Sequence, residues 1–342
     1  MNNSLKVGVF VDAENIKFNG GYQLRYDVLR RFAARYGGTL LRLNTYIAYD
    51  QERAREDSDY ARKSNIYQQM VREFGWKIIV KPVRRYVDED GNVTTKANAD
   101  LDMAVDAMLQ AENLDLVLLV TGDGDFLQVV TALQNHGCRV ELLAFKNVSM
   151  ALQRQVDAFY RGYLIPDLLP FSYEPRNEWG KPGSCVRGTC SKWFPDKGYG
   201  FLRFVKEISP DLWVTDPRDF GSPYESVFCH ANELADGVTA DDLIQRDTVV
   251  EFYLTESEQK DNGLVAQNVR MVYSPRRGEQ RSDHSVQREG NDPDNPVAPR
   301  SWGSRWSSRY SAAAQAVAPA PESANEGAAS AETAQEGASA GG

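Results

Sequence analysis

The hydrophobic positions of the first 170 residues follow two alternating periodicities. A continuous apolar run, typical of a strand buried on both faces, occurs at 6–12, and further strands are expected at 41–50, 76–83, 114–121 and 138–145. Apolar residues recurring every three or four positions predict helices over 22–37, 59–74, 98–112, 125–136 and 149–160. We expect a polar turn at "DEDGN" (88–92) and a short last strand at "GYLIPD" (162–167). Strands that alternate with helices predict a mostly parallel sheet covered on both faces.

The pattern changes after "YEPRNEWGKPGS" (173–184), a stretch containing Pro and Gly that is typical of a linker. Short strand-like runs without a long helix follow at 185–194, 198–205, 226–231, 248–254 and 265–273, which predicts a small β-barrel. The last residues are almost entirely Ala, Glu, Ser, Gly and Pro, a composition that predicts disorder. We therefore expect an α/β domain (1–170), a linker (171–184), a barrel (185–274) and a disordered low-complexity tail (275–342).

Composition and charge exclude several classes of protein. The formal net charge of −9 disfavours a protein held on nucleic acid by bulk charge alone. The apolar runs fall short of the ~18 residues of a membrane helix, and the amino terminus lacks a signal-peptide pattern, so we expect a cytoplasmic location. The four cysteines do not show the spacing of a zinc site and are expected to be free thiols: Cys138, Cys185, Cys190 and Cys229.

Acidic residues follow three separate elements of the expected α/β domain. Asp12 ends the first strand, Asp100 lies near the start of the helix over 98–112, and Asp123 and Asp125 follow the strand over 114–121. Ligands of open parallel sheets bind beyond the carboxyl ends of the strands, so these acids are expected to meet at one edge. Two carboxylates 4 Å apart repel by roughly 4 kcal/mol at an effective dielectric of 20. The cluster therefore predicts a hard divalent cation, Mg²⁺ or Mn²⁺, which can activate water for phosphodiester cleavage.

Each of these residues also has a simpler interpretation when it is taken alone. Asp125 is an ordinary helix cap and "TGDGD" an ordinary turn, while Asn15 could orient a water or phosphate or could form a turn. The coincidence of the acids at the ends of elements favours one joint site. A Toprim-like or HAD-like hydrolase fits less well, because the first strand ends in "DAE" rather than in a glutamate or D-x-D.

Three segments resemble, in order, the motifs of the NYN domain, a relative of PIN-domain nucleases, in its bacterial LabA-like branch. They are "VGVFVDAENI", "KANADLDMAVDAML" and "LLVTGDGDFLQVVTALQNHGCRVELL". The resemblance covers roughly residues 5–167 and implies a PIN-like three-layer α/β/α fold and metal-dependent RNA cleavage. It places the family's acidic residues on Asp12, Asp100, Asp123 and Asp125, with Asn15 beside the first. We expect these five residues to be catalytic, with the metal held by Asp12, Asp100 and Asp123 and with Asp125 assisting. The family usually has a lysine, a glycine, an apolar residue and the aspartate where this chain has "KANAD"; the lysine and the aspartate are kept.

Aromatic residues alternate along two of the expected barrel strands. Tyr199 and Phe201 share one side of "SKWFPDKGYGFLRF" (191–204), and Phe228 and His230 repeat this arrangement in "SVFCH". Exposed aromatic rings can stack unpaired bases, each worth roughly 1–3 kcal/mol, and basic residues are available for phosphates: Lys192, Lys197 and Arg203. Aromatic residues in strands usually fill a core. Here, however, Gly198 and Gly200 leave the opposite face of the strand without side chains, which favours binding.

The same segments resemble the cold-shock domain, an OB-type barrel that binds single-stranded RNA or DNA. "KGYGFL" and "VFCH" match its two nucleic-acid motifs, and "GLVAQNVRMV" resembles its last strand. The resemblance places base-stacking positions at Trp193, Tyr199, Phe201, Phe228 and His230. The spacing from "KWF" to "KG" is one residue short, Ala231 replaces a common aromatic, and the segment after Phe204 is long. Residues 184–273 contain nine Lys and Arg against fifteen Asp and Glu, so binding should depend on stacking more than on charge.

Together these patterns predict a metal-dependent ribonuclease whose barrel holds a single-stranded substrate. The alternative is a non-catalytic RNA-binding or regulatory adaptor. "PRSWGSRWSSRYS" in the tail mixes arginine with aromatic residues and is either an accessory RNA or protein contact or simply a disordered segment. The sequence leaves homo-oligomerisation, the RNA target and the polarity of cleavage open.

Overall fold

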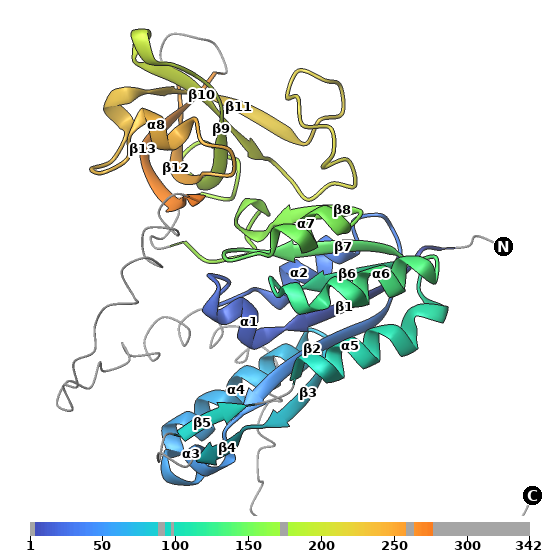
Figure 1. The fold of residues 1–342 in the computed structure, drawn as a ribbon. Helices are drawn as coiled ribbons and strands as arrows, with labels where there is room; N and C mark the ends of the chain where they lie inside the picture. The colour runs from blue at the N-terminus through green and yellow to red at the C-terminus, as the bar shows by residue number, and fades with distance from the viewer. Residues whose placement is uncertain (1–3, 88–92, 97–98, 172–176, 258–262, 276–342) are drawn as a thin grey trace, which may run out of the picture. The chain divides into compact units, whose positions relative to one another are not determined.

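The computed structural model describes residues 4–87, 93–96, 99–171, 177–257 and 263–275. An α/β domain comes first, and a closed β-barrel follows it in the chain (Figure 1). None of the helices in these ranges is long and apolar enough to cross a membrane. The expected turn at 88–92 and the tail beyond residue 275 lie outside the described residues.

The α/β domain is built on a six-stranded sheet with the order β3-β2-β1-β6-β7-β8, in which every neighbouring pair is parallel. Its strands are β1 (Lys6–Asp12), β2 (Thr39–Tyr49), β3 (Lys77–Pro82), β6 (Leu116–Val120), β7 (Arg139–Ala144) and β8 (Ala158–Arg161). The central strand β6 is buried at every position, as its uninterrupted apolar sequence predicts. A short antiparallel hairpin of β4 (Arg84–Val87) and β5 (Val93–Lys96) stands apart from this sheet.

Helices cover both faces of the sheet, which gives the expected three layers. The helices are α1 (Ala13–Phe18), α2 (Tyr26–Ala33), α3 (Gln51–Glu56), α4 (Ser58–Glu73), α5 (Ala99–Gln110), α6 (Leu127–Asn135) and α7 (Met150–Gln155). Alternate residues of β1 face opposite layers: Val9 packs in the core with Phe32 of α2, whereas Phe10 packs in the core with Met103 of α5. The predicted α/β fold is therefore confirmed.

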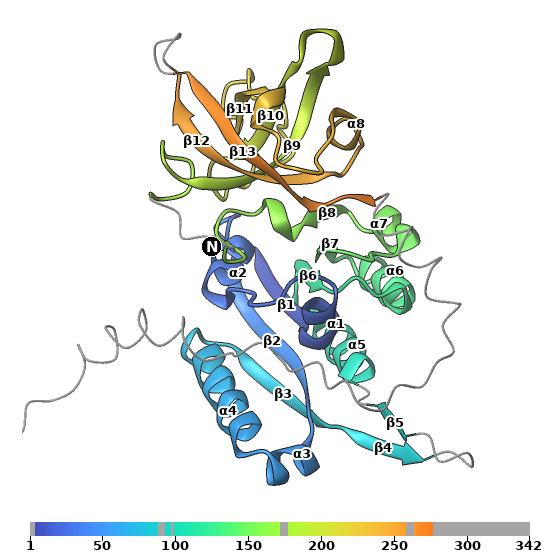
Figure 2. The ribbon, with the colours of Figure 1, turned by 90° about the vertical axis from the view of Figure 1, so that its left-hand side faces the viewer.

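The strand order changes direction at β1, which lies between β2 and β6. Such a switch point leaves a crevice beyond the carboxyl ends of the two strands, where ligands of open α/β sheets bind. Helix α1 follows β1 directly at this edge (Figure 2). A ligand-binding site is therefore expected at the end of β1 and the loop after β6.

The barrel closes in the order β10-β11-β13-β12-β9. Its strands are β9 (Cys185–Phe194), β10 (Tyr199–Val205), β11 (Tyr224–His230), β12 (Val249–Glu256) and β13 (Leu264–Tyr273), with one short helix, α8 (Ala240–Leu243). Its interior is filled by alternate strand residues such as Val186, Leu202, Val227 and Phe252. The five strands agree closely with the five apolar runs of the sequence.

Several expected elements of the α/β domain are wrong in extent. The helix expected over 22–37 is only α2, because residues before it form turns and Gln23 adopts a φ of 64°. The helix expected over 149–160 ends at Gln155. Asp157 then pairs with Val140 of β7 through both its backbone N–H (2.9 Å) and its carboxylate (2.7 Å), which starts β8. "GYLIPD" is accordingly not the last strand, and α1 and α3 were not expected at all.

Candidate active site

Asp12 lies at the carboxyl end of β1 and is almost completely buried, with 4% of its surface exposed. Its Oδ1 accepts a hydrogen bond of 3.0 Å from the backbone N–H of Asn15, so the side chain caps α1. Its Oδ2 accepts a bond of 3.3 Å from the hydroxyl of Thr121 at the end of β6. Asp12 is therefore fixed from both sides of the switch point.

The loop after β6 is held by the same network. The Thr121 hydroxyl accepts the backbone N–H of Asp123 (3.3 Å), and Asp123 Oδ1 accepts the backbone N–H of Asp125 (3.0 Å). Asp123, rather than Asp125, therefore caps the short 3₁₀ segment Gly124–Phe126 that precedes α6. The expectation that Asp125 is the cap is wrong, because its exposed carboxylate lies one residue inside the segment.

Asp100 joins this group from the first turn of α5. Its carboxyl group is hydrogen-bonded to that of Asp12 and lies within electrostatic range of Asp123 and Asp125. Asp12 in turn feels the charges of Asp100 and Asp123. The structure thus brings together the four acids predicted from the sequence, hereafter the acid cluster: Asp12, Asp100, Asp123 and Asp125.

The acid cluster changes the protonation of its members. Burial raises the pKa of Asp12 to about 7, and the negative charges of Asp100 and Asp123 add to this effect. The hydrogen bonds from Asn15 and Thr121 act in the opposite direction, because they stabilise the carboxylate. Burial also raises the pKa of Asp100, with Asp123 as the next cause, while its bond to Asp12 lowers it. Asp12 and Asp100 therefore both keep a proton to higher pH than ordinary aspartates do.

The other acids of α5 have different neighbours. Asp102 forms an ion pair with Lys81 of β3. Asp106 accepts a hydrogen bond of 2.7 Å from the hydroxyl of Tyr46 in β2. These contacts pin α5 onto the sheet and so hold Asp100 at the carboxyl edge.

Asn15 has a positioning role in the structure. Its side-chain oxygen accepts the backbone N–H of Gly122 at 2.8 Å, which ties α1 to the loop that carries Asp123. Thr121 is a second positioning residue, and it was not singled out from the sequence. The one feature of the sequence that could have indicated this role is the position of Thr121, a hydroxyl residue at the end of an apolar strand and directly before "GDGD".

The acid cluster fits a hard divalent cation by its chemistry. Carboxylate oxygens are the ligands that Mg²⁺ and Mn²⁺ prefer, and a raised pKa is the expected mark of carboxylates whose charge is not neutralised. Among the described residues, however, no group of three or more His, Cys, Asp or Glu side chains is already arranged to hold a metal ion.

Comparison with known protein families gives a match for the α/β domain. Residues 6–165 match the family model of the NYN domain. The resemblance seen in the three sequence motifs is therefore confirmed for this segment. A crystal structure of a protein of unknown function from Vibrio parahaemolyticus RIMD 2210633 is similar over 47% of this chain and 94% of that chain, with 21% sequence identity and a TM-score of 0.38. No curated protein matches the chain.

Downstream of the NYN domain, the barrel carries a group of half-buried aromatic rings on its outer side. Phe194 of β9, Tyr199 and Phe201 of β10, and Phe228 of β11 form what we call the aromatic face. The ring centroids are 5.3 Å apart for Phe194 and Tyr199, 5.5 Å for Tyr199 and Phe228, and 6.1 Å for Phe201 and Phe228. The strand register explains the arrangement: Tyr199 lies between Phe194 and His230, and Phe201 lies between Lys192 and Phe228.

Trp193 does not belong to the aromatic face, although the cold-shock resemblance places a stacking position there. Its side chain is 9% exposed and packs with the barrel core, because successive strand residues point to opposite faces. A Cβ on Gly200 would come within 2.3 Å of the Trp193 ring. The sequence analysis expected the opposite face of β10 to be bare, and this expectation is wrong. The glycine makes room for Trp193, and Phe194 takes the outward position.

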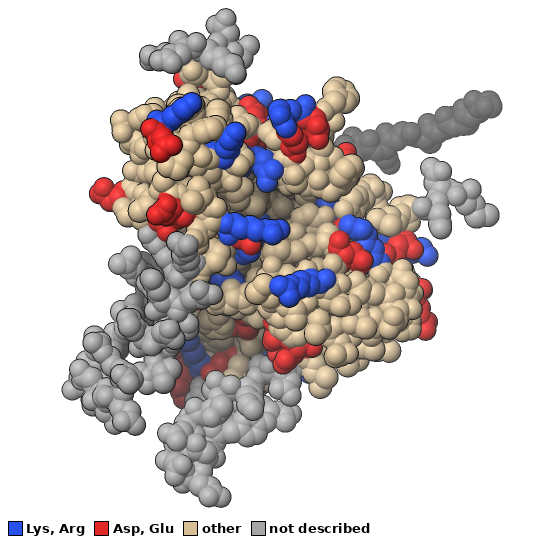
Figure 3. Space-filling model, turned by 45° about the horizontal axis from the view of Figure 1, so that its top comes forward, with Lys and Arg blue, Asp and Glu red and all other residues tan. Residues whose placement is uncertain are grey.

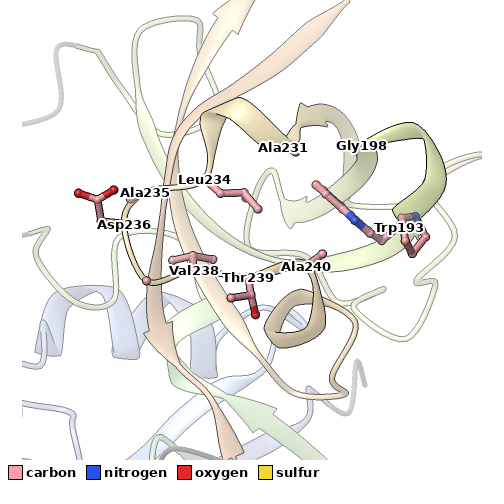
Figure 4. A pocket seen from close by; sticks show the side chains of 11 residues that line it. Trp193, Gly198, Ala231, Leu234, Ala235, Asp236, Val238, Thr239 and Ala240 are labelled. Carbon is pink, nitrogen blue, oxygen red and sulfur yellow. The ribbon is translucent and has the colours of Figure 1, made fainter.

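Trp193 instead forms part of the wall of a separate cavity of about 390 Å³. The cavity lies between the β9–β10 turn and the segment from Ala231 to Ala240 (Figure 4). Its labelled lining is largely apolar, with Leu234 and Val238 between Trp193 and the single acid, Asp236. The carboxyl group of Asp236 points away from the centre of the cavity in this view.

The basic residues expected to contact phosphates differ in their availability. Lys192 and Lys197 are exposed and lie 4.6 and 5.8 Å from the centroid of the Phe194 ring. Arg203 is engaged elsewhere: it donates to the carbonyl of Thr215 at 2.7 Å and lies over Tyr224. Figure 3 shows basic and acidic side chains interspersed over a mostly uncharged surface.

Proposed function

We propose that the chain is a metal-dependent ribonuclease that cleaves single-stranded RNA at the acid cluster. The observation that carries the proposal is the convergence of the four carboxylates at the switch point of an NYN domain. Four acids from three elements are costly to bring together, and stability alone gives no reason to do so. The NYN match supports a nuclease, and the donor chemistry supports Mg²⁺ or Mn²⁺ as cofactor.

Asp12, Asp100 and Asp123 would hold the cation, and Asp125 would assist from the exposed side of the cluster. A bound divalent cation supplies Lewis-acid activation of water and neutralises charge on the phosphodiester. The protein's own residues supply the positioning. Thr121 and Asn15 fix Asp12 and the Asp123 loop, and Asp102 and Asp106 fix the helix that bears Asp100.

The aromatic face of the barrel would bind unpaired bases of the same RNA or of single-stranded DNA. Its four rings offer stacking surfaces worth roughly 1–3 kcal/mol for each base. Lys192 and Lys197 lie beside Phe194 and would contact the phosphates. This assignment follows the cold-shock resemblance, with Phe194 in place of Trp193.

The decisive experiment is cleavage of labelled single-stranded RNA by the full-length protein with Mg²⁺ or Mn²⁺ and with EDTA. We expect cleavage that requires the metal and falls by at least about 100-fold in Asp12→Asn. Asp59→Asn, which changes an exposed acid on α4, should cleave like the wild type. Equal cleavage by the wild type and Asp12→Asn would contradict the catalytic assignment.

A non-catalytic RNA-binding or regulatory adaptor is the competing function. The aromatic face supports the adaptor as well as the ribonuclease, because base stacking does not require the acid cluster. RNA binding that persists in EDTA, with no cleavage under either metal, would support the adaptor and exclude the ribonuclease.

A further inference from the structure

Exposed apolar side chains occur on two helices that adjoin the segments carrying the acid cluster. Phe18, the last residue of α1, is 75% exposed, and Met150, the first residue of α7, is 65% exposed. Single exposed apolar residues are common on protein surfaces. These two, however, flank the segments that carry Asp12 and Asp123, so their position links them to the site.

The end of α1 is held firmly although the Phe18 ring is exposed. Asn19, the next residue, accepts the backbone N–H of Lys146 at 2.9 Å through its carbonyl and the side-chain amide of Asn147 at 2.9 Å through its Oδ1. The loop after β7 that supplies these bonds also contacts the acidic loop, because the backbone N–H of Ser149 donates to the carbonyl of Gly122 at 3.1 Å. Phe18 therefore has a fixed position relative to Asp123.

Two lysines accompany Phe18. The ammonium group of Lys17 lies 5.1 Å from the centroid of the Phe18 ring and 3.6 Å from a carboxylate oxygen of Glu14. The stem of Lys146 lies against Gly20, where an added Cβ would be 3.2 Å from its methylene carbons. Lys146 is exposed and forms no ion pair with any described residue. Lys146 thus brings a positive charge to the loop that contacts Gly122, whereas the charge of Lys17 is shared with Glu14.

We propose that Phe18, flanked by Lys17 and Lys146, stacks an unpaired base of the RNA strand whose backbone crosses the acid cluster. An exposed ring offers the π-face that every base can use, and adjacent ammonium groups pair with phosphates on either side. A protein partner would instead require a contiguous apolar patch. The inference rests on the proposed function, because the stacked strand is the one that is cut.

Photocrosslinking in EDTA tests this contact without cleavage. The full-length protein would be irradiated with a short oligouridine containing one 5-iodouridine, and the crosslinked peptides would be identified by mass spectrometry. We expect a crosslink within the tryptic peptide "FNGGYQLR", which begins at Phe18, and its loss in Phe18→Ala. Crosslinks confined to the barrel would overturn the proposal.

Affinity for the same RNA provides a quantitative test. Phe18→Ala should weaken binding by about fivefold or more, the value of one stacked base. Leu109→Ala is the matched control, because this side chain is 69% exposed but lies near the other end of α5, about 13 Å along the helix from Asp100. An equal effect of the two substitutions, with unchanged thermal stability in both, would show that Phe18 makes no stacking contact.

The two proposals fail in different ways. If the protein never cleaves RNA but Phe18 crosslinks and contributes to affinity, the stacking site stands and the ribonuclease is excluded. If metal-dependent cleavage occurs and kcat/KM of Phe18→Ala equals that of Leu109→Ala, the ribonuclease stands and the stacking site is excluded.

Discussion

Asp12 illustrates, at the scale of one residue, how a candidate catalytic group differs from a structural one. A carboxylate that only capped α1 would have a lowered pKa, because its hydrogen bonds favour the charged form. Asp12 accepts such bonds, and yet its pKa is raised to about 7. Burial and the neighbouring acids outweigh the cap, so the residue destabilises the folded state when it is charged.

Because charged Asp12 destabilises the folded state, the free energy of unfolding in EDTA should depend on pH. Because the folded state keeps the proton of Asp12 up to about pH 7 and the unfolded state loses it near pH 4, wild-type stability should fall with rising pH between these values. Above about pH 7 this contribution should level off. Asp12→Asn keeps an oxygen that can cap α1 but removes the charge. At about pH 8 the variant should exceed the wild type by roughly 2–4 kcal/mol in free energy of unfolding.

Urea denaturation at several pH values, in EDTA, measures this difference. Asp59→Asn serves as the control, because Asp59 is exposed and pairs with Arg62 on the surface of α4. A destabilised Asp12→Asn, or a variant that keeps the pH dependence of the wild type, would show that the acid cluster is not strained.

At the scale of one element, β9 shows how a single position changes the assignment of a site. Its residues alternate between solvent and core, so Lys192 and Phe194 face outward and Trp193 faces inward. The turn to β10 is one residue shorter than in the cold-shock pattern, and the outward ring beside Tyr199 is Phe194. The choice of a base-stacking residue therefore depends less on the type of aromatic residue than on whether its position in the strand faces solvent or core.

Substitutions in β9 separate the two roles. Phe194→Ala should weaken binding of single-stranded RNA by about fivefold or more and leave stability close to that of the wild type. Trp193→Ala should instead destabilise the barrel by about 3–5 kcal/mol, because it empties a core position next to Gly200. Fluorescence anisotropy and thermal melts of the full chain measure both. A folded Trp193→Ala with the larger loss of affinity would reverse the assignment.

The elements also show what sequence patterns can predict. Long apolar runs such as 114–121 located the strands, and the acids at their ends were brought together as expected. Short elements were missed, because α1 and α3 each have only six residues and too little periodicity. Glu141 lies inside an apolar run, and only the fold shows that Arg35 neutralises its charge in the interior and that the hydroxyl of Tyr36 donates a hydrogen bond to it. Such long-range partners leave no local signal.

At the scale of the whole molecule, the charge distribution sets how the protein can hold RNA. The formal net charge is −9, and the barrel segment contributes −6 through fifteen acidic and nine basic residues. The face in Figure 3 shows mixed charges rather than a continuous basic surface. Recognition by stacking, at the aromatic face and at Phe18, is consistent with this distribution, whereas recognition by bulk charge is not.

The salt dependence of RNA binding tests this conclusion. Each phosphate neutralised on a single strand contributes about 0.7 to the slope of log K against log salt concentration. Three exposed lysines lie beside the proposed stacking rings, Lys17, Lys192 and Lys197, and the exposed Lys146 lies against Gly20, two residues after Phe18. The slope should therefore be no steeper than about −3. Replacing Lys192 and Lys197 by Gln should reduce it by about 1.4 without abolishing binding, whereas Lys63→Gln on α4 should leave it unchanged. A slope much steeper than about −3, or complete loss of binding in the double variant, would mean that charge rather than stacking holds the RNA.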